Sequence, residues 1–248
     1  MRRVRLMTIL AVAASAAACA ALKPAVAPIR TVRYVDRAGA PCTVVLLPGR
    51  WNAPEEFGRA GFPAVLEDGG VRAAIVAPDA HLGYYMRETV LERLRHDVVG
   101  PARAAGRPVW VVGVSMGGLG ALLYARDHPG ELAGIVAIAP FLGDRDVIDE
   151  ITSSGGLDAW EPARPPAPDD YQRRLWLWLK EVTASDVGMP ELYLGYGTDD
   201  RFAGSAELLG AQLEGRRVLA EAGGHDWPTW RRLFERIVAA GAIGPPCR

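Results

Sequence analysis

The segment Gly113-Val114-Ser115-Met116-Gly117-Gly118 follows the apolar run 108–112 and precedes a stretch, 119–125, with the composition of a helix. This order predicts a sharp strand-to-helix turn that raises one serine hydroxyl above the edge of a sheet. In such a turn the residues two before and two after the serine lie so close together that a Cβ atom would clash, which explains the two glycines. Ser115 is therefore a candidate nucleophile, although a glycine-rich turn with a capping serine would contain the same residues.

The rest of the chain alternates short apolar runs with longer amphipathic stretches. Seven runs predict strands, at residues 30–35, 42–47, 71–77, 108–114, 132–139, 191–195 and 216–220. Most of these runs are unbroken, as expected of strands with helices on both faces. Helices are predicted between them, at residues 54–66, 86–105, 116–128, 203–213 and 229–240. Strand and helix in alternation predict one α/β domain, residues 30–248, with a mostly parallel sheet.

Two later turns hold an acid and a histidine. The strand predicted at 191–195 is followed by Tyr196-Gly197-Thr198-Asp199-Asp200-Arg201-Phe202, and the strand predicted at 216–220 by Glu221-Ala222-Gly223-Gly224-His225-Asp226-Trp227-Pro228. With serine, acid and histidine in this order, residues 42–240 resemble the α/β-hydrolase superfamily. The resemblance implies an α/β-hydrolase fold and a serine nucleophile that works with a histidine and a carboxylate.

The resemblance implies a role for each of these side chains. His225 would accept the proton of Ser115 and return it to the leaving group, while a carboxylate would hold the imidazole in the right tautomer. Asp199 and Asp200 both lie in the acid turn, and only one of them can face the ring. We expect Asp200, because similar family turns place the acid before a polar or proline residue and then an apolar one. For His225 the alternative is an ordinary loop histidine.

Two backbone N–H groups would stabilise the oxyanion that forms on attack. The amide of Met116, directly after the nucleophile, is the first. The resemblance puts the second in the loop Leu47-Pro48-Gly49-Arg50-Trp51, where Pro48 replaces the histidine of many family members and the Arg50 amide is expected to donate.

The long segment 141–190 separates two predicted strands and contains four prolines between residues 162 and 168. A connection of this length suits a lid over a site. Several tryptophans fall in segments expected near the nucleophile, and aromatic walls suit an apolar or aromatic acyl or alcohol group. We predict that Trp51 and Trp227 bind substrate. For Trp176 and Trp178, within the insertion, packing of the lid on the body is an equal alternative.

The charges are nearly balanced, with 28 Lys and Arg against 29 Asp and Glu. Binding of nucleic acid, which needs a basic excess on one face, has no support in this composition. Histidine pairs four residues apart and Cys-x-x-Cys pairs are both absent from the sequence, so we expect no metal and no other cofactor. His81, His96 and His128 are expected in surface or capping positions.

The N-terminus has the pattern of an export signal. Arg2, Arg3 and Arg5 precede an uncharged, alanine-rich stretch at residues 6–22, and residues 23–29, with two prolines, are predicted to form a tether. Ala16-Ala17-Ala18-Cys19 resembles the lipobox of bacterial lipoproteins, in which the cysteine becomes lipidated and anchors the protein to a membrane. Cleavage by ordinary signal peptidase and a frayed helix of a cytosolic protein are the alternatives. We expect a protein of the periplasm, cell envelope or extracellular space.

The remaining cysteines, Cys42 and Cys247, are an even number in an oxidising compartment. Cys42 opens a predicted strand at the edge opposite the catalytic loops. The last predicted helix starts beside His225 and runs back toward that same edge. A disulfide between Cys42 and Cys247 is therefore predicted.

Together these features predict an exported serine hydrolase that cleaves a small-molecule carboxylic ester through an acyl-enzyme. The same residues would also serve a thioesterase, a peptidase or an acyltransferase. A function of another class, an envelope scaffold that keeps the fold without turnover, would not need Ser115, Asp200 and His225 at the three turns. The oligomeric state is left open.

Overall fold

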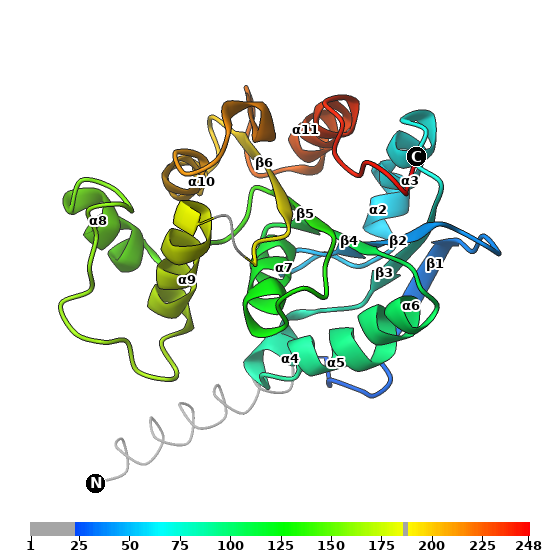
Figure 1. Cartoon of the computed structure of the whole chain (residues 1–248), viewed down its shortest axis with the longest axis horizontal. Coiled ribbons are helices and arrows are strands. Elements are labelled where there is room, and N and C mark those ends of the chain that lie inside the picture. Colours follow the sequence, from blue (N-terminus) through cyan, green and yellow to red (C-terminus); the bar gives the residue numbers. More distant parts are fainter. Residues whose placement is uncertain (1–22, 186–187) are drawn as a thin grey trace, which may run out of the picture.

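A computed structural model describes residues 23–185 and 188–248 (Figure 1). The predicted signal, residues 1–22 with Cys19, lies outside the described residues. In the part of the chain that is described, the structure contains no helix both long and apolar enough to span a bilayer.

The described chain is built on a seven-stranded sheet with the order β1-β3-β2-β4-β5-β6-β7. Its strands are β1 (Thr31–Val35), β2 (Cys42–Leu47), β3 (Ala73–Pro78), β4 (Val109–Val114), β5 (Gly134–Ile138), β6 (Glu191–Gly197) and β7 (Val218–Glu221). Only the pairing of β1 with β3 is antiparallel. All seven predicted strands are present, shifted at their ends by at most two residues, and the predicted α/β fold class is confirmed.

The unbroken apolar runs arise because both faces of the sheet are covered. In β2, Val45 and Leu47 pack into one hydrophobic core, while Val44 and Leu46 pack into a second core on the opposite face. The first core is closed by α5 (Val90–Leu94), α6 (Gly100–Ala104), α7 (Met116–Asp127), α9 (Tyr171–Ser185) and α10 (Ala203–Gly210). The second is closed by α2 (Glu56–Arg59), α3 (Phe62–Asp68) and α11 (Trp227–Ala239), which lie together in Figure 1.

Two of the predicted helices are interrupted. The helix predicted at 54–66 is split into α2 and α3 by Gly61, whose φ of 77° lies outside the helical region. The helix predicted at 86–105 starts only at α5 and continues through a π-helical turn (Arg95–Val99) into α6. A short helix that was not predicted, α4 (Leu82–Met86), precedes it, and Glu88, with a φ of 56°, separates α4 from α5. The apolar spacing continues through both interruptions, so the sequence pattern does not reveal them.

The segment 141–190 contains α8 (Arg145–Ser153) and α9, which pack beside α7 and α10 (Figure 1). Trp176 is fully buried, and its Nε1 donates a hydrogen bond of 2.8 Å to the carbonyl oxygen of Leu142. Of the two readings for Trp176, packing on the body is therefore the one observed. The segment reaches the predicted site through Phe141, whose ring contacts that of Phe202.

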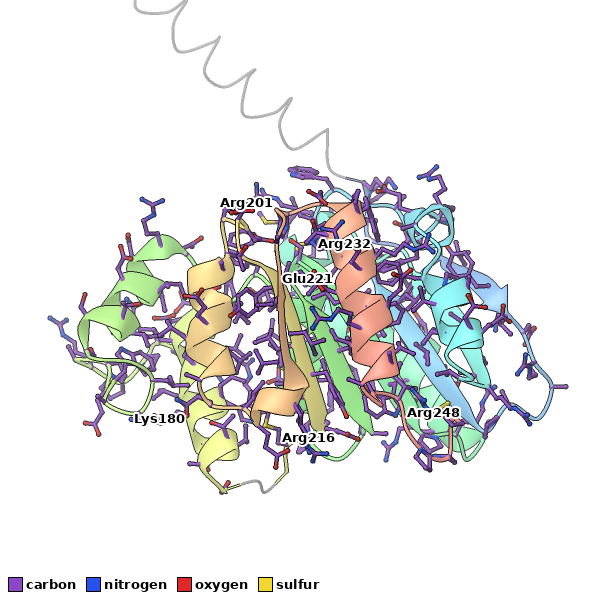
Figure 2. All side chains as sticks on the ribbon, turned by 90° about the horizontal axis from the view of Figure 1, so that it is seen from above. Lys180, Arg201, Arg216, Glu221, Arg232 and Arg248 are labelled. Carbon is purple, nitrogen blue, oxygen red and sulfur yellow. A yellow bond between two sulfur atoms is a disulfide. The ribbon has the colours of Figure 1, made fainter. Side chains whose placement is uncertain are left out.

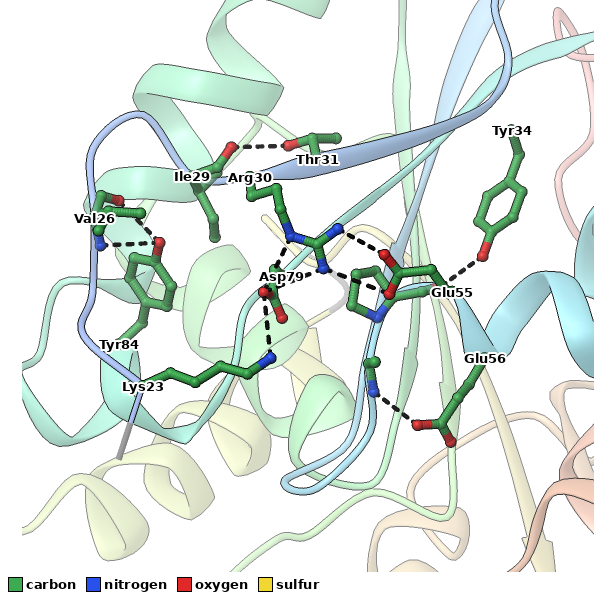
Figure 3. Close-up of polar contacts among 12 residues, drawn as sticks. Lys23, Val26, Ile29, Arg30, Thr31, Tyr34, Glu55, Glu56, Asp79 and Tyr84 are labelled. Atoms are coloured by element: carbon green, nitrogen blue, oxygen red, sulfur yellow. Dashed lines mark hydrogen bonds and ion pairs between the residues drawn. The ribbon is translucent and has the colours of Figure 1, made fainter. Parts of the chain in front are cut away.

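Residues 23–29 form neither helix nor strand, as their prolines predict, but they are held against the body. The Tyr84 hydroxyl accepts a hydrogen bond from the Val26 amide and donates one to the Val26 carbonyl (Figure 3). The amide of Ile29 donates to Asp97, and the Ile29 side chain is buried. The expected tether is thus a fixed strap, because its polar backbone groups find partners on the helices of the body.

A disulfide joins Cys42, at the start of β2, to Cys247, with 5.4 Å between their Cα atoms. The parallel strands bring their starts to one edge of the sheet, and α11 returns the chain to that edge. In Figure 2, Arg248 lies near this edge, and Arg201, next to Asp200, lies near the opposite one. The predicted disulfide is therefore present in the structure.

Replacing both cysteines, as Cys42→Ser with Cys247→Ser, is expected to lower the free energy of unfolding by about 4 kcal/mol, because the bond closes a very long loop in the unfolded chain. Chemical denaturation with and without reductant measures this, and the reductant should affect only the wild-type protein. As a control, Cys19→Ser leaves only these two cysteines, and thiol titration of that variant in denaturant without reductant should find none free. Two free thiols would contradict the assignment.

Candidate active site

The turn between β4 and α7 holds Ser115 in a strained conformation, with φ 54° and ψ −118°. The Ser115 amide donates a hydrogen bond to the carbonyl of Ile138, which fixes the turn to the end of β5. A Cβ atom at Gly113 would lie 2.3 Å from the carbonyl oxygen of Gly117, and one at Gly117 would lie 2.1 Å from that of Leu47. Only glycine fits at these two positions, which accounts for the Gly-x-Ser-x-Gly pattern.

The acid and histidine turns are joined to each other by backbone hydrogen bonds. The amide of Thr198 donates to the carbonyl of Glu221, and the amide of Asp199 donates to that of Gly223. A Cβ atom at Gly197 would lie 2.2 Å from the carbonyl oxygen of Gly223, so glycine is needed for this close approach. The ends of β6 and β7 therefore present their loops as one unit.

The three predicted side chains meet at this edge of the sheet. His225 Nε2 lies 2.9 Å from Ser115 Oγ, and His225 Nδ1 lies 2.7 Å from Asp200 Oδ2. The other oxygen of Asp200 accepts a hydrogen bond of 2.8 Å from the amide of Phe202, and the carboxylate is fully shielded from solvent. Asp199 is exposed and does not take this place. A carboxylate, an imidazole and a hydroxyl joined in this way can move a proton from the hydroxyl to the ring.

The His225 ring is also held from its sides. It packs edge to face against Phe202 and Trp230, with centroid distances of 5.1 and 4.9 Å. Directly after it, Asp226 caps α11 by accepting a hydrogen bond from the amide of Thr229, and this bond lowers the pKa of Asp226. These contacts restrict the imidazole to the orientation in which both of its nitrogens have partners.

The loop after β2 approaches the nucleophile. A Cβ atom at Gly49 would lie 3.2 Å from Ser115 Cβ and 2.6 Å from the Oδ1 of Asn52. Met116 begins α7, so its amide has no acceptor within the helix. Arg50 follows Gly49 on the same loop. The structure thus brings Gly49, the residue before Arg50, close to Ser115, and the donation of the Arg50 and Met116 amides to an oxyanion stays a prediction.

The two predicted substrate-binding tryptophans lie in different surroundings. Trp51 is largely exposed, at 76%, and borders a cavity of about 180 Å³ beside the loop after β2. Trp227 instead packs edge to face against Phe57, Phe62 and Trp230. Trp227 is half-buried against these three rings, and its expected role in substrate binding stays a prediction.

Glu56 connects the loop after β2 to the histidine turn, a role that sequence reasoning missed. Its carboxylate accepts hydrogen bonds from the Ala53 amide (2.9 Å), Asn52 Nδ2 (2.9 Å) and Trp227 Nε1 (2.8 Å). Burial raises the pKa of Glu56, but these three hydrogen bonds and the charge of Arg59 outweigh it and hold the pKa below its ordinary value. The only sequence signal was an acid at the start of a predicted helix.

The other three histidines are not part of this hydrogen-bonded chain. His81 caps α4, and its Nδ1 accepts a hydrogen bond from the amide of Gly83. His96 lies in the π-helical turn, and His128 lies at the end of α7. Within residues 23–185 and 188–248, no cluster of three His, Cys, Asp or Glu side chains is arranged to hold a metal ion.

Comparison with known proteins agrees with this architecture. A family described as serine aminopeptidase, S33, matches residues 92–160, a segment that contains Ser115 but neither Asp200 nor His225. No curated protein matches the chain.

Solved structures match over most of the chain. An S-formylglutathione hydrolase of Staphylococcus aureus is 16% identical, with a TM-score of 0.54 over 82% of each chain. A fluorophosphonate-binding serine hydrolase of the same species is 15% identical, with a TM-score of 0.54 over 88% of this chain and 98% of that one. A ferulic acid esterase is 16% identical, with a TM-score of 0.52 over 81% and 84%. These likenesses show an α/β-hydrolase fold.

Glu56→Gln is expected to lower kcat/KM for a reactive ester by about tenfold, because a neutral amide holds the loop after β2 and Trp227 less firmly. Glu56→Gln should also lower the free energy of unfolding, by an amount that depends on pH. A carboxylate whose pKa is lowered by folding contributes stability above its unfolded pKa, and this contribution is lost as the pH falls through the folded pKa. The difference in unfolding free energy between wild type and variant, measured by denaturation, should therefore shrink below about pH 4.

The matched control is Glu67→Gln, at an exposed carboxylate on α3, which should change neither quantity. Equal kinetics for wild type and Glu56→Gln would show that this link does not position the site.

Proposed function

We propose that this protein, whose fold is that of the α/β-hydrolases, is a serine hydrolase that cleaves carboxylic esters through an acyl-enzyme on Ser115. The observation that carries the proposal is the hydrogen-bonded chain from Ser115 through His225 to the buried Asp200. A scaffold without turnover would gain nothing from this chain or from the strained Ser115 backbone, which costs on the order of 1 kcal/mol or more.

In the proposed reaction, His225 Nε2 removes the Ser115 proton as Oγ attacks the ester carbonyl. The bond from Oγ to the carbonyl carbon forms, and the carbonyl electrons move to the oxygen, where the amides of Met116 and Arg50 stabilise the negative charge. Collapse breaks the bond to the alcohol, which leaves with the proton from His225. Water then repeats the sequence and releases the acid. Asp200 holds the ring through Nδ1 and stabilises the imidazolium.

We also propose that the protein is exported. The basic and apolar N-terminal pattern motivates this, and the Cys42–Cys247 disulfide supports it, because such bonds persist in oxidising compartments. Attachment to a membrane through Cys19 remains part of this proposal. Fractionation of cells that produce the full chain, with Cys19→Ser as the comparison, tests both points. Recovery of the protein in the cytosol would exclude export.

Ser115→Ala and His225→Ala are each expected to lower kcat for a p-nitrophenyl ester by about 10³-fold or more, and Asp200→Asn by somewhat less. A fluorophosphonate probe should label the wild-type protein and fail to label Ser115→Ala. A thioester and a peptide, assayed alongside the ester series, distinguish the alternative substrates.

The matched control is Asp199→Asn, which neutralises the neighbouring exposed carboxylate and should leave kcat unchanged. An equal loss of kcat in Asp199→Asn and Asp200→Asn would show that Asp200 is wrongly assigned as the partner of His225. A wild-type protein that neither binds the probe nor hydrolyses any of the three substrate classes would favour the scaffold.

A further inference from the structure

The cavity beside the loop after β2 is lined by residues of three separate segments. The loop after β2 contributes Arg50–Ala53, the start of α4 contributes His81–Gly83, and the strap contributes Lys23. Gly49 lies between the cavity and the nucleophile, since it contacts both Ser115 and the lining residue Asn52. A substrate attacked at Ser115 would have to extend past Gly49 to place a group in the cavity.

Two of the side chains that line this cavity, Lys23 and Arg50, are cationic. Within the described residues, Arg50 forms no ion pair, and its guanidinium lies 4.9 Å from the centroid of the Trp51 ring. Lys23 has a weak partner, because its Nζ lies 3.6 Å from Asp79 Oδ2 and its side chain is 62% exposed. The same oxygen of Asp79 already accepts two hydrogen bonds from Arg30 (Figure 3).

The nearby acids are balanced by other partners. Arg30 bridges Asp79 and Glu55, and Glu56 accepts its three hydrogen bonds within the protein. Arg30 pairs with two of these acids, and Glu56 lies 4.0 Å from Arg59, so Arg50 is the lining cation that has no acidic partner in the described part of the chain. An anionic group entering the cavity would meet cations that can still form charge-assisted hydrogen bonds.

His81 adds a donor rather than an acceptor. Its Nδ1 accepts the hydrogen bond from the Gly83 amide. Burial lowers the pKa of His81, and the charges of Lys23 and Arg87 lower it further. Asp79 raises it, but by less, so the net effect favours the neutral ring. A neutral ring that accepts at Nδ1 carries its proton on Nε2, so the remaining ring nitrogen donates.

We propose that this cavity is an anion subsite, and that the preferred substrates are esters that carry a carboxylate near the scissile bond. Lys23 and Arg50 would bind the carboxylate as cations, and His81 would donate a hydrogen bond. The inference rests on the proposed ester hydrolysis at Ser115 and adds a substrate class to it. It also gives the strap a function, because the strap brings Lys23 to the cavity.

Two pairs of soluble esters test the subsite on both sides of the scissile bond. On the acyl side, mono-p-nitrophenyl glutarate is compared with p-nitrophenyl valerate, and on the alcohol side para-acetoxybenzoate is compared with its methyl ester. We expect a preference of about tenfold in kcat/KM for the anionic member of at least one pair, equivalent to one charge-assisted hydrogen bond. The preference should shrink in 1 M salt, where exposed charges are screened within about 3 Å.

Three variants test the residues. Lys23→Met and Arg50→Met remove the charges and keep the aliphatic stems, while His81→Asn keeps a capping acceptor for Gly83 and removes the ring donor. Each should reduce the ratio of kcat/KM between the anionic and the neutral ester by about threefold or more. The control is Arg216→Met, which removes an exposed arginine at the opposite edge of the sheet and should leave the ratio unchanged (Figure 2).

The outcomes separate the two proposals. Hydrolysis of the neutral esters without a preference for either anionic ester, or a preference that survives in both Lys23→Met and Arg50→Met, would overturn the anion subsite and leave the hydrolase intact. A wild-type protein that hydrolyses none of the four esters and is not labelled at Ser115 by a fluorophosphonate would overturn both.

Discussion

A single imidazole has to contact a hydroxyl and a carboxylate that come from two other loops. His225 does so with both ring nitrogens, at 2.9 Å from Ser115 and 2.7 Å from Asp200. Because hydrogen bonds weaken steeply with misalignment, the ends of β4, β6 and β7 must be held together with little freedom. The parallel sheet provides this, since it delivers the carboxyl ends of these strands to one edge.

The close approach of these loops depends on the absence of side chains at defined positions. Gly113 and Gly117 allow the serine turn to fold on itself, and Gly197 allows the acid turn to lie against the histidine turn. The packing of Phe202 and Trp230 on His225 then restricts the ring. The close backbone approach thus sets the positions of the three loops, and the aromatic packing sets the orientation of the His225 ring.

Polar side chains outside the hydrogen-bonded triad connect the site to its surroundings. Glu56 links the loop after β2 to Trp227, and so joins the loop with the expected oxyanion donor to the turn that holds His225. Arg50 of the same loop and Lys23 of the strap border the cavity. One loop would therefore serve both the oxyanion and the charge of the substrate, which couples chemistry to the choice of substrate.

The α/β fold, the seven strands and the turns that hold Ser115 and His225 could be predicted from the sequence, because apolar runs and glycine turns are local signals. The choice of Asp200 over Asp199 followed from the resemblance to the α/β-hydrolases. The sequence could not show the breaks at Gly61 and Glu88, since the apolar spacing continues through them. The packing of Trp227 against Phe57, Phe62 and Trp230, the link that Glu56 forms between two loops and the position of Lys23 at the cavity are visible only in the folded chain. These are contacts between residues distant in the chain, and they depend on how the elements pack.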